Sequence, residues 1–227
     1  MKRKLAIFMS FVMLFSTAVI LPADKEHPAK AEETVTASGY WTDVAEPFQT
    51  KDASGNVLGD SRDNPILIES AEQLAYLAKE INEGTKENNI SRGKYYRLEK
   101  NIDLSGKYWT AIGIYGQEFQ GSFNGNGKVI QGLTVDETKT KKTAGFFGDV
   151  YAIEKGCGLL EDITILGADI KGTYCYKPEG GSGNDKIDST GYGAILAASV
   201  FGNDKENAMA EVVSCRVQGK LVFEGDW

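Results

Sequence analysis

The sequence predicts an all-β fold: a right-handed parallel β-helix of about four rungs, with one amphipathic helix capping its N-terminal end. Three observations lead to this expectation. Short β-rich segments recur about every 30 residues, Gly/Asn/Asp turns separate them, and a single stretch shows clear helical periodicity. A β-sandwich is the alternative, because many short strands separated by turns also fit that architecture.

The N-terminus has the layout of a secretory signal peptide. Residues 2–4 are basic and residues 5–21 form an apolar run. Small residues predict cleavage after Ala31, with Ala23 as a second candidate. The alternative is an uncleaved membrane anchor, although the run is short for a spanning helix. We therefore expect a secreted protein at the cell surface, without membrane insertion after cleavage.

Composition narrows the possible functions. The chain of 227 residues has a formal charge of −7, and loss of five basic and two acidic residues with the leader changes it to −10. Such acidity disfavours nucleic acid as a partner. The single histidine, His27, lies in the leader, so the mature chain has no His-activated nucleophile and no His-ligated metal. We expect no cofactor and no enzymatic activity.

The cysteines permit one internal disulfide in an exported chain. The chain has three, Cys157, Cys175 and Cys215, with no Cys-x-x-Cys pair. Cys157 and Cys175 are the pair nearest in sequence and form the candidate bridge. The alternative is that all three are small apolar core residues.

Residues 70–83 are expected to form the helix, after a flexible segment over 32–64 and a short extended lead-in. Ser70 and Gln73 fit a capping box, in which side chains satisfy the exposed backbone donors of the first turn. Gly84 is the expected end of the helix. Its apolar stripe comprises Leu74, Leu77, Ala78 and Ile81.

The β-rich segments resemble one another. Residues 130–135, 160–165 and 212–217 share apolar positions one, four and six, and the shorter segment 102–104 fits the last two. The expected equivalent central residues are Ile102, Leu133, Ile163 and Cys215. Such units bury their apolar face only by stacking on neighbours, which favours a solenoid over residues 65–227.

A second element separates these segments. Residues 144–150 precede the third segment, and residues 194–200 precede the fourth at the equivalent place. The helix can cover the open N-terminal edge of the stack, where unpaired strands would recruit other chains. No comparable cover follows the last unit, so we expect a truncated array whose C-terminal end is covered by further repeats or by a partner.

Four motifs in order resemble the GLUG-motif repeat family of exported bacterial surface proteins. They lie at residues 64–75, preceded by Trp41, and at 96–113, 119–135 and 145–148. The resemblance implies a parallel β-helix with a role in surface display, adhesion or scaffolding, and it transfers no catalytic residues. The sequence departs from the pattern at 195–198, where the second Gly motif is missing, and in an insertion at about 173–192.

The Gly-rich stretch at 121–127 could be mistaken for a phosphate loop. It lacks the Gly-Lys-Ser/Thr signature and precedes a strand rather than a helix, whose N-terminus a phosphate site needs. We interpret it as turns that use positive φ angles. Phe119 and Phe123 are then packing residues.

Paired carboxylates support the alternative function, a polysaccharide-degrading β-helix enzyme. Glu161 adjoins Asp162, and Asp185 lies near Asp188 in the insertion. Two carboxyl groups about 5–9 Å apart can hydrolyse a glycoside, and several together can bind calcium. The simpler interpretation is a solvated acidic surface.

The insertion at 173–192 is the expected binding surface, since loops on a rigid repeat scaffold commonly carry function. Tyrosines provide contact area at low entropic cost and stack on sugar rings. An ordinary solvated loop is the alternative. The chain is thus interpreted as an exported surface module with an adhesive, ligand-binding or spacer role, with carbohydrate or a host or matrix protein as its partner. The candidate contact residues are Tyr174, Tyr176, Lys177, Asp185 and Tyr192.

Overall fold

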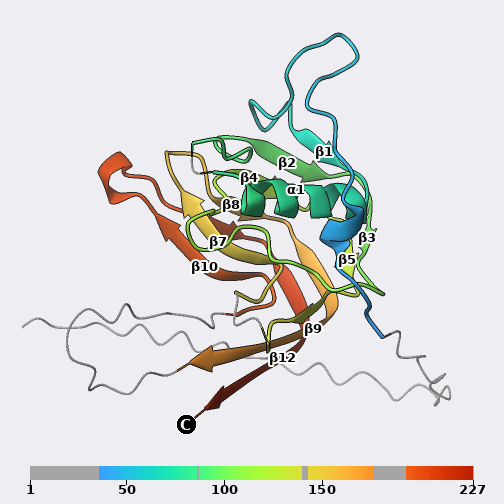
Figure 1. Ribbon diagram of the computed structural model, residues 1–227. Helices are drawn as coiled ribbons and strands as arrows, with labels where there is room; N and C mark the ends of the chain where they lie inside the picture. Colours follow the sequence, from blue (N-terminus) through green and yellow to red (C-terminus); the bar gives the residue numbers. More distant parts are fainter. Residues whose placement is uncertain (1–35, 86, 140–142, 176–192, 227) are drawn as a thin grey trace, which may run out of the picture. The chain divides into compact units, whose positions relative to one another are not determined.

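The computed structural model describes residues 36–226, apart from 86, 140–142 and 176–192 (Figure 1). The predicted signal peptide and its cleavage site at Ala31 lie outside these residues. In the part of the chain that is described, no helix has the length and apolar character needed to cross a membrane.

Over the described residues the structure is mostly β, with one α-helix and two short 3-10 helices, η1 (Trp41–Val44) and η2 (Asp204–Glu206). Every pairing between named strands is parallel. The β-sandwich alternative is built from antiparallel sheets, so these parallel ladders disagree with it.

The strands form three sheets (Figure 1). The first has five strands in the order β1 (Ile66–Ile68), β2 (Tyr95–Leu98), β4 (Ser122–Asn124), β8 (Leu159–Glu161) and β11 (Glu211–Val213). The second runs β3 (Ile102–Asp103), β5 (Val129–Gln131), β9 (Thr164–Cys175) and β12 (Arg216–Asp226), with β6 (Thr134–Asp136) also beside β9. The third pairs β7 (Phe147–Ala152) with β10 (Ala197–Gly202).

The helix α1 (Ala71–Glu83) forms as the sequence predicts. The Ser70 hydroxyl accepts from the backbone N–H of Gln73 at 3.2 Å, while the Gln73 side chain accepts from the N–H of Glu69 at 2.8 Å. The second bond thus goes one residue upstream of the expected partner. Gly84 ends the helix as predicted, with φ −73°, and a Cβ there would press on the Glu80 carbonyl oxygen. The apolar stripe is buried in the core.

Apolar residues lie in register across the sheets and fill the core. In the first sheet the aligned residues are Ile66, Tyr96, Phe123, Leu160 and Val212. In the second they are Ile102, Ile130, Ile165 and Val217. All are at most 3% exposed except the last of each series, Val212 at 47% and Val217 at 44%. Phe119 and Phe123 are fully buried, as predicted.

The predicted equivalence of the β-rich segments is partly wrong. Ile130 pairs with Ile165, and Val135 pairs with Ile170, whereas the pattern aligned Ile130 with Leu160. Seven positions separate Phe123 from Ile130, but five separate Leu160 from Ile165, because the corner between the first two sheets is longer at 125–128. The same correction applies to the expected alignment of Ile102 with Leu133: Ile102 pairs with Ile130.

Two other parts of the pattern are confirmed. Leu160 pairs with Val212, and Ile165 with Val217, so the last two units align as predicted. The elements at 144–150 and 194–200 also correspond, since Ala144 bridges to Gly193 and Val150 pairs with Val200.

Residues 36–64 have defined contacts, although their polar, turn-rich sequence predicts a flexible segment over 32–64. Trp41 is buried, and its indole N–H donates to the Leu104 carbonyl at 2.9 Å. Phe48 is 6% exposed and packs edge-on against Tyr76 and Tyr96. These aromatic anchors hold the segment against the core, which polar composition alone does not reveal.

Cys157 is a buried free thiol, and Cys215 is free as well. The candidate bridge between Cys157 and Cys175 is therefore not formed in this structure. Cys175 lies on β9 and pairs with Asp226 through the backbone.

Candidate functional site

The solvent side of the five-stranded sheet carries two rows of side chains. Because side chains alternate along a strand, the neighbours of the buried core residues point outward. One row aligns Tyr95 with Ser122, which is itself buried, and, further along, Leu159 with Glu211. The second row aligns Arg97, Asn124, Glu161 and Val213.

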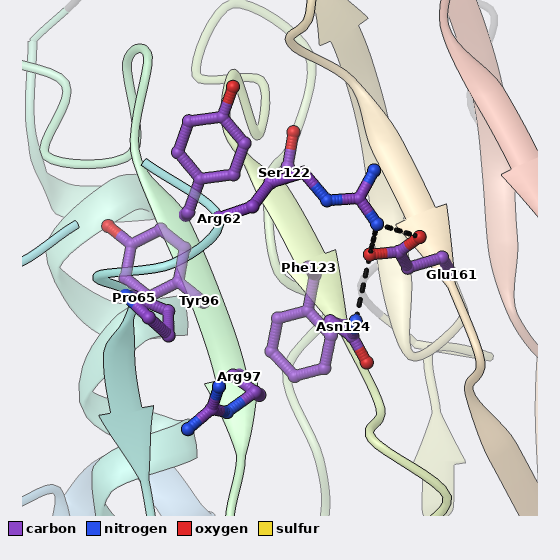
Figure 2. A pocket seen from close by; sticks show the side chains of 9 residues that line it. Arg62, Pro65, Tyr96, Arg97, Ser122, Phe123, Asn124 and Glu161 are labelled. Carbon is purple, nitrogen blue, oxygen red and sulfur yellow. Dashed lines mark hydrogen bonds and ion pairs between the residues drawn. The ribbon is translucent and has the colours of Figure 1, made fainter. Parts of the chain in front are cut away.

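Arg62 reaches across this face from the turn before β1. Its guanidinium contacts both carboxylate oxygens of Glu161, at 2.6 and 2.7 Å, and Asn124 Nδ2 donates to the same carboxylate at 2.8 Å (Figure 2). The Glu161 side chain is 18% exposed and that of Arg62 59%. Both contacts come from the same guanidinium nitrogen, Nη2, so the carboxylate is held by one Arg62 nitrogen together with the Asn124 amide. These contacts hold the turn that carries Arg62 against the sheet.

A cavity of about 480 Å³ lies beside this ion pair. This volume falls within the usual range for small-molecule sites. Its walls combine an aromatic ring and apolar surface with several hydrogen-bonding groups from distant parts of the chain. They comprise Arg62, Tyr95, Lys155, Gly156, Cys157, Leu159, Asn207, Met209 and Glu211.

The Cys157 thiol is a wall of this cavity rather than a nucleophile. Burial, and next the Glu154 carboxylate, raise the pKa of Cys157. A raised pKa keeps the sulfur protonated at neutral pH, and the thiolate is the reactive form. Its Sγ lies 3.9 Å from Glu154 Oε1. Cys157 therefore contributes shape and a weakly polar surface.

The expected carboxylate pair does not converge on one point. Glu161 is on β8 and is held by Arg62 and Asn124, while Asp162 forms the following corner with φ 53°. Asp185 and Asp188 lie outside the described residues. In the part of the chain that the structure describes, no group of three or more His, Cys, Asp or Glu residues is placed to hold a metal ion.

The structure does not describe most of the predicted contact residues. Tyr176, Lys177, Asp185 and Tyr192 lie outside the described residues. Tyr174 lies on β9, where it pairs with Gly225 of β12. Binding by the insertion therefore stays a prediction. The structure shows a second candidate surface, on the first sheet.

Sequence reasoning named Glu161 and Cys157 for other roles and missed Arg62 and Tyr95. Tyr95 belongs to a short strand that alternates inward and outward residues, 95–98, and that alternation could have marked its ring as solvent-facing. Arg62 had no such signal. It lies 99 positions from Glu161 and meets it only because parallel strands stack side by side.

Comparison with known proteins gives little. No protein-family profile matches this chain, and no solved structure gives a significant match. A similar protein from Evansella cellulosilytica, named "Putative Gly-rich membrane protein", is 26% identical over 113 residues. The match covers 47% of this chain and 12% of that protein, so the chain spans only a small part of its relative's length.

Proposed function

We propose that this chain is an exported bacterial surface module that binds extracellular carbohydrate on a right-handed parallel β-helix. Membership of the GLUG-motif repeat proteins is part of this proposal, and it rests on the four ordered motifs of the sequence. The leader-like N-terminus supports export.

The order in which the chain visits its sheets supports the β-helix. From β4 it passes to β5 and β6 in the second sheet, then to β7 in the third, and returns to the first at β8. It repeats this circuit through β9 and β10 to β11. Parallel pairing between successive circuits is the arrangement expected when equivalent strands stack above one another.

The cavity beside the Arg62–Glu161 pair is the observation on which ligand binding rests. A sugar ring has apolar C–H faces and polar hydroxyl edges, so it needs both kinds of surface at once. Tyr95 and Met209 offer the first kind, while Asn207 and Glu211 offer amide and carboxylate groups. Glu161 is ion-paired with Arg62 and accepts a hydrogen bond from Asn124, which favours recognition over hydrolysis.

We also propose that the C-terminal end of the stack is covered by further repeats or by a partner. Core-aligned residues there, among them Val212, Val217 and Leu221, are 44–47% exposed. An exposed apolar surface with unpaired strand edges favours association.

Binding to polysaccharides tests the proposal. The purified chain would be sedimented with insoluble cellulose, chitin and peptidoglycan, beside a Tyr95→Ala variant. Tyr115→Ala is the matched control, because Tyr115 is 90% exposed and lies outside the cavity. We expect binding that Tyr95→Ala weakens and Tyr115→Ala leaves intact. Absence of binding to all three, or equal binding by both variants, would contradict it.

A further inference from the structure

A second cavity, of about 200 Å³, lies at a different place in the fold. It is lined by Tyr40, Tyr108, Asp136 and Lys139, none of which lines the cavity beside the Arg62–Glu161 pair. The two tyrosine rings have centroids 5.8 Å apart and planes tilted by 44°. Two rings at this angle form an open aromatic wall rather than a closed stack.

The backbone holds both tyrosines in place. Tyr40 and Tyr108 form a parallel bridge, in which Trp41 N donates to the Tyr108 carbonyl at 3.0 Å and Tyr108 N donates to that of Gly39 at 2.9 Å. The neighbouring Trp41 and Trp109 are buried, and each indole N–H donates to a backbone carbonyl. The aromatic wall is thus anchored on the core, so little ordering is needed on binding.

Polar groups complete the cavity. Trp109 N donates to the Thr134 carbonyl at 2.7 Å, which places β6, with Asp136 at its end, beside the tyrosines. Thr138 donates to Asp136 Oδ1 from its hydroxyl at 2.6 Å and from its N–H at 3.2 Å. These bonds lower the pKa of Asp136, so its carboxylate is ionised at neutral pH and can accept from hydroxyl groups. Lys139 adds a positively charged hydrogen-bond donor to the cavity.

We propose that this cavity is a second carbohydrate subsite, which takes a single gluco-configured pyranose ring. An aromatic wall receives the apolar C–H face of such a ring, while Asp136 and Lys139 bond its equatorial hydroxyls. The cavity is smaller than the usual range for drug-sized ligands, which suits one ring. The ligand class rests on the proposed function, but the subsite stands on its own residues. Two separated subsites on one rigid scaffold increase the avidity for a polymer.

Calorimetric titration of the full chain with cellotetraose, and separately with chitotetraose, tests the subsite. We expect two binding sites per chain with at least one of these sugars. Tyr108→Ala should reduce the number from two to one, and Asp136→Asn should weaken one site about tenfold. If Tyr108→Ala fails to fold, Asp136→Asn still tests the subsite, because Asp136 is partly exposed and the change keeps the shape of the side chain. Tyr108→Phe retains the ring and should keep both sites.

The two proposals fail separately. If Tyr95→Ala leaves the number of sites unchanged while Tyr108→Ala reduces it, the larger cavity is not the binding site and the second subsite stands. If Tyr108→Ala and Asp136→Asn both leave binding as in the unaltered chain, the second subsite is overturned. If neither sugar binds, it is overturned as well.

Discussion

Val150 and Val200 lie opposite each other in adjacent parallel strands, yet Val150 is fully buried and Val200 is 38% exposed. The two side chains share one position in the ladder and differ in what covers them. Val150 has β10 beside it, whereas β10 is the last strand of its sheet among the described residues. The core thus has an apolar surface at the end formed by β10, β11 and β12.

This pair gives the first prediction. Val150→Ala should lower the free energy of unfolding by about 2–3 kcal/mol, because it removes buried methyl groups and leaves a cavity. Val200→Ala should cost about 1 kcal/mol or less, since its methyl groups are already partly in water. Urea denaturation of both variants measures the difference. Equal losses would mean that another molecule covers Val200 in solution.

Glycine at the long corner gives the second prediction. A Cβ at Gly125 would overlap the carbonyl oxygen of Asp162, so Gly125→Ala requires the backbone of the next strand layer to move. Gly55 is the control, because it has φ +85° and no atom within 4 Å of the added Cβ. Gly55→Ala should cost about 1–2 kcal/mol through backbone strain alone, and Gly125→Ala clearly more. Thermal unfolding monitored by circular dichroism compares them, and a smaller loss for Gly125→Ala would contradict the packing.

The sequence predicted best where the signal is local. The helix over 70–83 was expected from its cap and its apolar stripe, both of which depend on residues three or four apart. The correspondence of 144–150 with 194–200 was also predicted, because the two elements occupy equivalent places before their β-rich segments, and Val150 pairs with Val200. Gly148 is needed in the first of them, because a Cβ would overlap the Gly113 carbonyl oxygen in the neighbouring layer, whereas residues 197 and 198 of the later element are both alanine.

The register was harder to predict because it depends on corner length. The apolar pattern of 130–135 matches 160–165 position by position, yet Ile130 stacks on Ile165. Gly132, with φ +71°, turns the chain between β5 and β6, so apolar residues on either side belong to different strands. The pattern of apolar positions alone does not indicate such a turn. Arg62 was missed as a wall of the larger cavity for a related reason, since it meets Glu161 only through the stacking of the strands.

The helix cap gives the third prediction. Ser70→Ala removes the acceptor for the Gln73 N–H and should destabilise the chain by about 1 kcal/mol. Ser70→Asp is the control, because a carboxylate accepts the same bond and also suits the positive end of the helix dipole. Chemical denaturation of the two variants at pH 7 measures both. A similar loss for Ser70→Asp would show that the hydroxyl has a role beyond capping.

A buried carboxyl group gives the fourth prediction, on pH dependence. Asp149 is 7% exposed, and burial together with the nearby Glu118 carboxylate raises its pKa. Below the unfolded-state pKa, near 3.8, the group is protonated in both states and costs nothing. As the pH rises above that value, the folded state resists ionisation and loses stability. Asp149→Asn should therefore raise the melting temperature at pH 7 but not below about pH 4.

Asp103 is the control of opposite sign. Hydrogen bonds from Ser105 lower its pKa, so its carboxylate stabilises the fold above the unfolded-state pKa and loses that effect as the pH falls through the folded-state value. Asp103→Asn should therefore lower the melting temperature at pH 7, and the difference should shrink in acid. Scanning calorimetry from pH 3 to pH 8 covers both variants. A drop for Asp149→Asn at pH 7 would mean that the ionised carboxylate has a stabilising partner.

The Arg62–Glu161 pair gives the last prediction, which separates fold from recognition. Arg62 is largely exposed, and exposed ion pairs contribute about 1 kcal/mol or less. A double-mutant cycle with Arg62→Ala and Glu161→Ala should accordingly give a coupling of that size. The same substitutions should weaken polysaccharide binding more strongly, because they release the turn that forms one wall of the larger cavity. A coupling of several kcal/mol with unchanged binding would make the pair a structural clamp and leave recognition to other residues.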